Sequence, residues 1–168
     1  MVLYIRLLSN DAEDFVLEAA VDDTATFMEL HLFIQKSLNY DTSGMASFVI
    51  TDNEWNRLKE ISLIKMNDDD EDVLLMEETT LVQFLKEQKQ RLLYVFDFFS
   101  ERAFFIEVFD KKEGVVNVPQ LLKLKGDIPV QFAIDDNLPE DTFDSEDEFS
   151  EGFEDIDDFD PDSFPDGY

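Results

Sequence analysis

Residues 92–109 read LLYVFDFFSERAFFIEVF, which is two aromatic-rich runs joined by a short polar link. The runs cover residues 92–98 and 103–109, and their composition predicts a β-hairpin. Side chains alternate between the faces of a strand, so one face of each strand would be apolar: Tyr94, Phe96 and Phe98 on the first, Phe104, Ile106 and Val108 on the second. Fully burying each such side chain is worth about 1.5–3 kcal/mol. The pattern therefore predicts that this hairpin forms the centre of the core.

Upstream of the hairpin, two β-rich runs and a helix are indicated. Residues 2–8 and 15–21 are separated by a polar stretch, which is typical of an opening pair of strands. Thr26 and Glu29 then form a capping box, the signature of a helix start. Apolar residues follow at helical spacing and would share one face: Phe27, Leu30, Ile34 and Leu38. Asn39 is a plausible end of this helix.

The remaining segments complete an α+β pattern. Short strands are expected at residues 47–51, 61–66 and 73–76, and edge structure and loop at 115–118 and 121–124. Thr80 and Gln83 form a second capping box, which predicts a short helix through Leu81, Phe84 and Leu85. Helices and strands do not alternate regularly. We therefore expect a single domain with a mixed, mostly antiparallel sheet and two flanking helices.

The last 34 residues, 135–168, differ sharply from the rest. They contain sixteen acidic side chains, no Lys, Arg or His, and single aromatics between the acids: Phe143, Phe149, Phe153, Phe159, Phe164 and Tyr168. Such a composition predicts a disordered tail with aromatic anchors that bind a partner. A tail that only confers solubility is the alternative, as is one that folds back onto its own domain. We expect an α+β domain at residues 1–134 and the tail at 135–168.

Charge and composition narrow the function. The formal net charge is −28, of which the tail carries −16, leaving −12 for residues 1–134. A field of this sign repels nucleic acid and anionic lipid, so a basic protein, a polyamine or metal cations are the expected partners. The chain has no cysteine, and no glycine-rich phosphate loop or apolar run long enough to span a membrane is present. We expect a cytoplasmic monomer without a cofactor.

Three motifs resemble a known family. Leu30-His31-x-x-Ile34-Gln35, then Phe48 in a strand, then Tyr94-x-Phe96-Asp97-Phe98 running into Ile106 are similar to the plasmid pRiA-type ORF-three-like family, which also occurs as a passenger of insertion elements. The similarity spans about residues 2–132. It implies one α+β domain and, because the molecular function of the family is not established, little mechanism.

The chain departs from that family at two places. The family's H-x-H-E-F pattern reads Gly44-Met45-Ala46-Ser47-Phe48 here, and its D-F-G-D-x-W-x-H segment reads Asp97-Phe98-Phe99-Ser100-Glu101-Arg102-Ala103-Phe104. If the family's histidines and acids formed a metal or acid–base site, this chain keeps only His31 and Asp97 of it. Any activity of such a cluster is therefore in doubt.

Three residues are the candidate functional positions within the domain: His31, Asp97 and Arg102. His31 would be a proton shuttle or lone ligand, but a half-buried histidine bonded to backbone or a carboxylate is the favoured interpretation. Asp97 would be a general base if buried, but capping a turn is favoured, with Arg102 as a salt-bridge partner. One histidine cannot make the usual metal site of two or three histidines, so we predict no catalytic, cofactor-binding or metal-binding residue.

The acidic stretch 67–78 has oxygen ligands at alternate positions, as a calcium loop does. Asp72 stands where that loop needs glycine, which favours a solvated loop instead. The sequence as a whole therefore predicts a non-enzymatic protein-interaction module whose acidic, aromatic tail recruits a basic partner. A degenerate metal-dependent or acid–base enzyme that uses His31 and Asp97 is the alternative.

Overall fold

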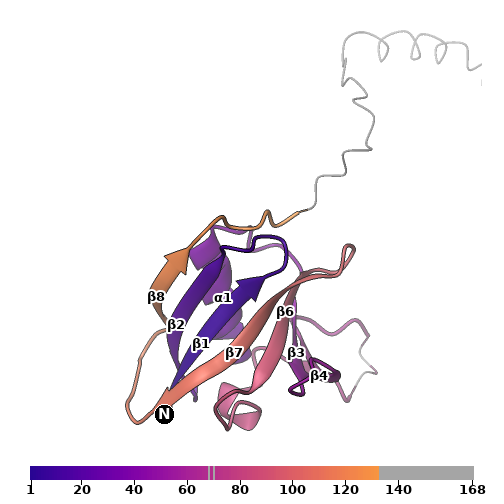
Figure 1. Cartoon of the computed structure of the whole chain (residues 1–168). Coiled ribbons are helices and arrows are strands. Elements are labelled where there is room, and N and C mark those ends of the chain that lie inside the picture. Colours follow the sequence, from indigo (N-terminus) through magenta and orange to yellow (C-terminus); the bar gives the residue numbers. More distant parts are fainter. Residues whose placement is uncertain (68, 70, 133–168) are drawn as a thin grey trace, which may run out of the picture. The chain divides into compact units, whose positions relative to one another are not determined.

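The computed structural model describes residues 1–67, 69 and 71–132, and these form one eight-stranded sheet with one α-helix (Figure 1). The strands are β1 (Val2–Ser9), β2 (Val16–Asp22), β3 (Ser47–Thr51), β4 (Arg57–Ser62), β5 (Leu74–Leu75), β6 (Arg91–Asp97), β7 (Arg102–Lys112) and β8 (Gln120–Lys125). The helix is α1 (Phe27–Leu38), and η1 (Leu81–Gln83) is a single 3-10 turn. None of the helices in these residues has the length and apolar character needed to cross a membrane.

The strand order is β5-β4-β3-β6-β7-β1-β2-β8, so the β6–β7 hairpin occupies the two central positions, as its sequence predicted. The sheet is mixed, because β5 runs parallel to β4 while the other neighbouring pairs are antiparallel. β8 pairs with β2 at one edge, and all of its residues are exposed. This agrees with the edge position expected for residues 121–124.

Helix α1 covers one face of the sheet and seals the main core. Thr26 Oγ1 accepts from the Glu29 N–H at 3.1 Å, and Glu29 Oε2 accepts from the Thr26 N–H at 2.8 Å, so the predicted capping box is present. Asn39 ends the helix with a left-handed φ of 54°. The side chains buried between α1 and the central strands include Phe27, Leu30, Ile34, Phe48, Tyr94, Phe104 and Ile106.

The second predicted helix is present only as the 3-10 turn η1, and its predicted capping box is wrong, because the Thr80 side chain makes no capping bond to the backbone. The two bonds of a capping box are not made there: the Gln83 N–H donates to the Thr80 carbonyl at 3.2 Å, and the Gln83 side chain donates to Thr80 Oγ1 at 3.2 Å. The N–H groups of Leu81 and Val82 donate to Ala25 O at 2.8 Å and to Asp23 O at 2.7 Å. The turn is therefore tied to the segment that leads into α1, which also supports the helix entrance.

Phe98 does not share the core face with Tyr94 and Phe96, contrary to the alternation. The register between β6 and β7 shifts between Val95 and Asp97, and β6 ends at Asp97. Such a bulge breaks the regular alternation of side chains. As a result Phe98 is 47% exposed, and the neighbouring Phe99 is fully exposed. The hairpin is therefore core along its length and exposed aromatic surface at its tip.

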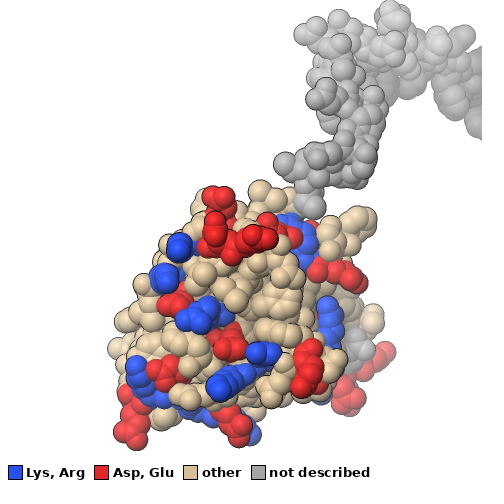
Figure 2. All heavy atoms as spheres, in the orientation of Figure 1, with Lys and Arg blue, Asp and Glu red and all other residues tan. Residues whose placement is uncertain are grey.

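The face of the sheet opposite α1 carries a small second cluster. Val49, Leu93 and Val95 are its buried members, with Trp55 and Phe105 packed against them. Oppositely charged side chains lie across the neighbouring strands in two ion pairs: Arg91–Glu107 at 3.2 Å and Arg6–Glu18 at 2.7 Å. Figure 2 likewise shows basic and acidic side chains interspersed on the visible surface. We call the face with the Val49 cluster the open face.

Candidate functional site

His31 lies inside the domain, where it joins α1 to β6. Its ring is only 1% exposed, and its Nδ1 shares a hydrogen bond of 2.8 Å with the hydroxyl of Tyr94. We expected a half-buried ring bonded to backbone or a carboxylate, but the ring is fully buried and its partner is a phenol. Burial lowers the pKa of His31 and raises that of Tyr94, because a charged form of either would lose its hydration. Both side chains are therefore neutral at pH 7.

Residues from all three motifs of the family resemblance lie near this hydrogen bond, whereas Asp97 and Phe98 lie at the hairpin tip. Gln35 follows His31 by one helical turn and is 2% exposed, and within the described residues its Oε1 has no hydrogen-bond partner. The ring of Phe48 on β3 lies 4.9 Å from that of Tyr94. The motifs thus mark the junction at which α1 packs on β3 and β6. At this junction the core contains both apolar packing and one buried hydrogen bond between side chains.

Asp97 caps the turn of the β6–β7 hairpin. Its Oδ1 accepts from the N–H groups of Phe99 and Ser100, both at 3.1 Å. Its Oδ2 lies 3.6 Å from Nη1 of Arg102 across the hairpin. The geometry is that of an Asx turn supported by an ion pair.

Arg102 connects the hairpin to two other segments. Its Nε donates to Oδ2 of Asp11 at 2.9 Å, and its Nη2 donates to the carbonyl of Val130 at 2.6 Å. The guanidinium also lies over the ring of Phe96, 4.9 Å from its centroid. Arg102 is therefore a structural link between the hairpin, the β1–β2 connection and the segment after β8.

His31 and Asp97 use different partners, and no hydrogen bond between them is present in the part of the chain that the structure describes. Nor do those residues contain a group of three or more His, Asp or Glu side chains that could hold a metal ion. In the acidic stretch, Leu74–Leu75 form β5 and the Met76 N–H donates to Ser62 O at 2.9 Å, so part of this segment belongs to the sheet. The tail phenylalanines 143, 149, 153, 159 and 164 lie outside the described residues.

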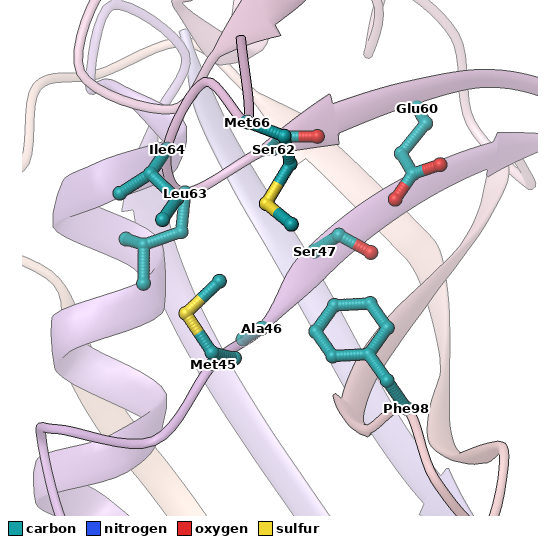
Figure 3. A pocket seen from close by; sticks show the side chains of 9 residues that line it. All are labelled: Met45, Ala46, Ser47, Glu60, Ser62, Leu63, Ile64, Met66 and Phe98. Atoms are coloured by element: carbon teal, nitrogen blue, oxygen red, sulfur yellow. The ribbon is translucent and has the colours of Figure 1, made fainter.

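A pocket of about 380 Å³ opens where β3 begins and β4 ends, and Figure 3 shows the side chains that line it. Its walls are apolar and come from three segments: Met45 and Ala46 before β3, Leu63, Ile64 and Met66 after β4, and Phe98 from the hairpin tip. Ser47, Ser62 and Glu60 supply its polar side. Ser47 pairs with Ser62, and Val49 with Glu60, so these side chains continue the open face.

A smaller hollow of about 160 Å³ adjoins this pocket and shares Ser47, Glu60 and Phe98 with it. Arg57 and Glu101 add two further charged side chains to its lining. An apolar compartment thus borders a compartment with two carboxylates and one guanidinium. We call the two compartments together the hairpin pocket.

Sequence reasoning missed the hairpin pocket. Residues 61–66 were expected to form one strand, but β4 ends at Ser62, so Ile64 and Met66 lie in the following loop, where they are 48% and 79% exposed. Periodicity assigns residues to the faces of strands, but it does not show which loops approach one another. The position of Phe98 also depended on the bulge in β6.

Comparisons with known proteins give a family and a fold. The family model for plasmid pRiA4b ORF-3-like protein matches residues 7–164, beyond residue 132, where the resemblance was expected to end. A crystal structure of a protein of unknown function from Methanosarcina mazei Go1 is similar, with a TM-score of 0.54, 19% identity and coverage of 73% of this chain and 68% of that one. No curated protein matches. The chain belongs to the plasmid pRiA4b ORF-3-like protein family.

Proposed function

We propose that the protein is a non-enzymatic interaction module whose acidic, aromatic tail recruits a basic partner. The observation that carries this proposal is the composition of residues 135–168, with sixteen carboxylates, six aromatics and no basic side chain. Opposite charge accelerates the encounter with a basic protein, and the aromatic rings then provide anchors that bury apolar area. Six rings exceed what solubility requires, because exposed aromatic surface works against solubility.

The contacts of the three candidate residues in the domain also support this proposal. His31 bonds Tyr94 within the core, while Asp97 and Arg102 hold the hairpin turn and neighbouring segments. These contacts stabilise the fold, as expected of a domain that acts as a scaffold. The alternative enzyme requires His31 and Asp97 to converge on one substrate, and no specific contact favours it.

Capture from cell extract tests the proposal. The full-length chain and a chain of residues 1–134 are used as baits under the same conditions. We expect basic proteins in the full-length capture that are absent from the shorter bait, and their loss as ionic strength rises, because screening weakens attraction between exposed charges. Identical partner sets for the two baits would contradict a recruiting tail.

Two matched tails separate charge from aromatic anchoring. One replaces the tail phenylalanines 143, 149, 153, 159 and 164 by serine at unchanged charge, and the other shuffles residues 135–168 at unchanged composition. We expect the serine tail to weaken capture of the basic partner by about tenfold or more, since aromatic anchors dominate binding energy. Capture that is unaffected by the serine tail would leave only a non-specific charge effect.

A further inference from the structure

We propose that the hairpin pocket is a second contact site for the partner, and that it takes a large aromatic side chain flanked by basic residues. The inference rests on the proposed function only in taking the partner to be a basic protein. It places a specific anchor on the domain itself, separate from the tail. The pocket has an apolar lining, a buried hydroxyl without a partner within the described residues, and charged side chains beside it.

The apolar compartment has the size and lining of an anchor site. Its volume of about 380 Å³ falls within the range of about 300–1,000 Å³ that is typical of ligand pockets. Met45 and Met66 line it, and methionine side chains adapt to varied partners and make favourable contacts with aromatic rings. Large aromatic residues are the commonest anchors in such pockets. The compartment therefore suits a Trp, Tyr or Phe side chain.

Ser47 supplies the second observation. The residue is 2% exposed and lines both compartments, yet within the described residues its Oγ has no hydrogen-bond partner. A buried hydroxyl without a partner is unfavourable, and a ligand that bonds it removes this cost. Figure 3 shows Ser47 between Met66 and Phe98, which are 79% and 47% exposed and so have room to move aside. An anchor with its own polar group, such as an indole N–H, would satisfy this hydroxyl.

The adjoining compartment selects for positive charge. Glu60 and Glu101 face one guanidinium, that of Arg57, and none of the three takes part in an ion pair within the described ranges. Residues 1–134 carry a net charge of −12, so the wider field has the same sign. A Lys or Arg next to the anchor would meet the two carboxylates. A segment with acidic neighbours would be repelled.

Phe98 allows binding in the pocket to be distinguished from non-specific binding to exposed aromatic residues. It lines both compartments, whereas the adjacent Phe99 is fully exposed and lines neither. The two rings have the same chemistry and adjacent places on one hairpin tip. They therefore form a matched pair for testing the pocket.

The test follows the methionine methyl signals of the full-length chain by NMR during titration with blocked tetrapeptides. The probe is Lys-Trp-Lys-Lys, and the controls are Lys-Ala-Lys-Lys and Glu-Trp-Glu-Glu. Met45 and Met66 line the pocket, while Met76 is buried in the core and Met1 lies at the chain end, so these two are internal references. We expect saturable shifts of Met45 and Met66 with the first peptide and much smaller ones with either control.

Variants complete the test. Phe98→Ala is expected to weaken binding of the probe by about fivefold or more, and Phe99→Ala to leave it unchanged. Glu60→Gln is expected to weaken it by about two- to threefold, against no change for Glu54→Gln, which lies outside the pocket. The melting temperature of each variant shows that the fold is retained.

Several outcomes would overturn the proposal. One is equal loss of binding in the Phe98 and Phe99 variants, and another is equal binding of all three peptides. Methyl shifts that depend on protein concentration before peptide is added would assign the pocket to a second copy of the chain. Probe binding should persist in the chain with the serine tail, so loss of tail recruitment and loss of this site are separate results.

Discussion

His31 lies in the core between α1 and β6, and its imidazole shares a hydrogen bond with the Tyr94 hydroxyl. The sequence singled it out as the only histidine, next to the apolar stripe of a helix. The structure places it against Tyr94 with its ring excluded from water. Its burial predicts a measurable effect on stability rather than on chemistry.

Because of His31, the free energy of unfolding should decrease as the pH is lowered. Burial lowers the pKa of His31 below its ordinary value of 6.5, so the unfolded chain binds a proton there before the folded chain does. The stability contribution is therefore complete above pH 6.5 and is lost as pH falls below it, by at most about 1.4 kcal/mol per pH unit. Urea unfolding of the wild-type chain and of His31→Gln between pH 5 and 7.5 should show this slope only in the wild type.

Tyr94→Phe is the matched control for that experiment. It removes the hydroxyl that bonds His31 but leaves the imidazole buried, so its stability should be lower overall while the pH slope remains. A pH slope of the same size in the wild type and in His31→Gln would show that other groups cause it.

Residue-level reasoning predicted more of the core than of the surface. Alternation placed Tyr94, Phe96 and Phe104 in the core, where all three are buried. It failed at Phe98, because a bulge depends on pairing with the neighbouring strand and has no pattern in the strand itself. The exposure of the hairpin tip, and therefore the pocket, could not be predicted from the sequence alone.

At the scale of elements, α1 is the part of the fold that local sequence specifies best. Thr26, Glu29 and the apolar spacing predicted its start and its buried face, and both are confirmed. The same kind of signal at Thr80 and Gln83 was misleading, because the Gln83 N–H donates to the Thr80 carbonyl and the Gln83 side chain bonds the Thr80 hydroxyl, so neither bond of a capping box forms. The residue types of a capping box therefore indicate a helix reliably only where apolar residues continue at helical spacing, as they do after Thr26.

The helix cap should be worth a measurable part of the stability. Thr26→Ala removes the acceptor for the Glu29 N–H, and the expected loss is about 1 kcal/mol in the free energy of unfolding. Urea unfolding at pH 7 measures it.

Thr80→Ala is the control for this prediction, because the Thr80 side chain makes no cap bond to the backbone. Its effect should stay within about 0.5 kcal/mol. Equal losses in the two variants would mean that the contact between these two segments, and not the cap, is what Thr26 contributes.

For the whole molecule, charge and sheet architecture together support an interaction module. The sheet has α1 on one face and an open face on which two ion pairs, Arg6–Glu18 and Arg91–Glu107, balance part of the charge. The hairpin pocket lies at one end of that face, beside two carboxylates. That a partner would be basic stays a prediction from composition. The pocket could not be predicted, because three segments that are separate in sequence form it and no local pattern shows their approach.

Amide NMR of the isotope-labelled full-length chain, titrated with a basic partner captured as described above, tests the recruiting tail most directly. We predict that the signals of Phe143, Phe149, Phe153, Phe159 and Phe164 shift or broaden in proportion to the bound fraction. Signals of these five residues that stay unchanged while the partner binds saturably to the domain would contradict the account.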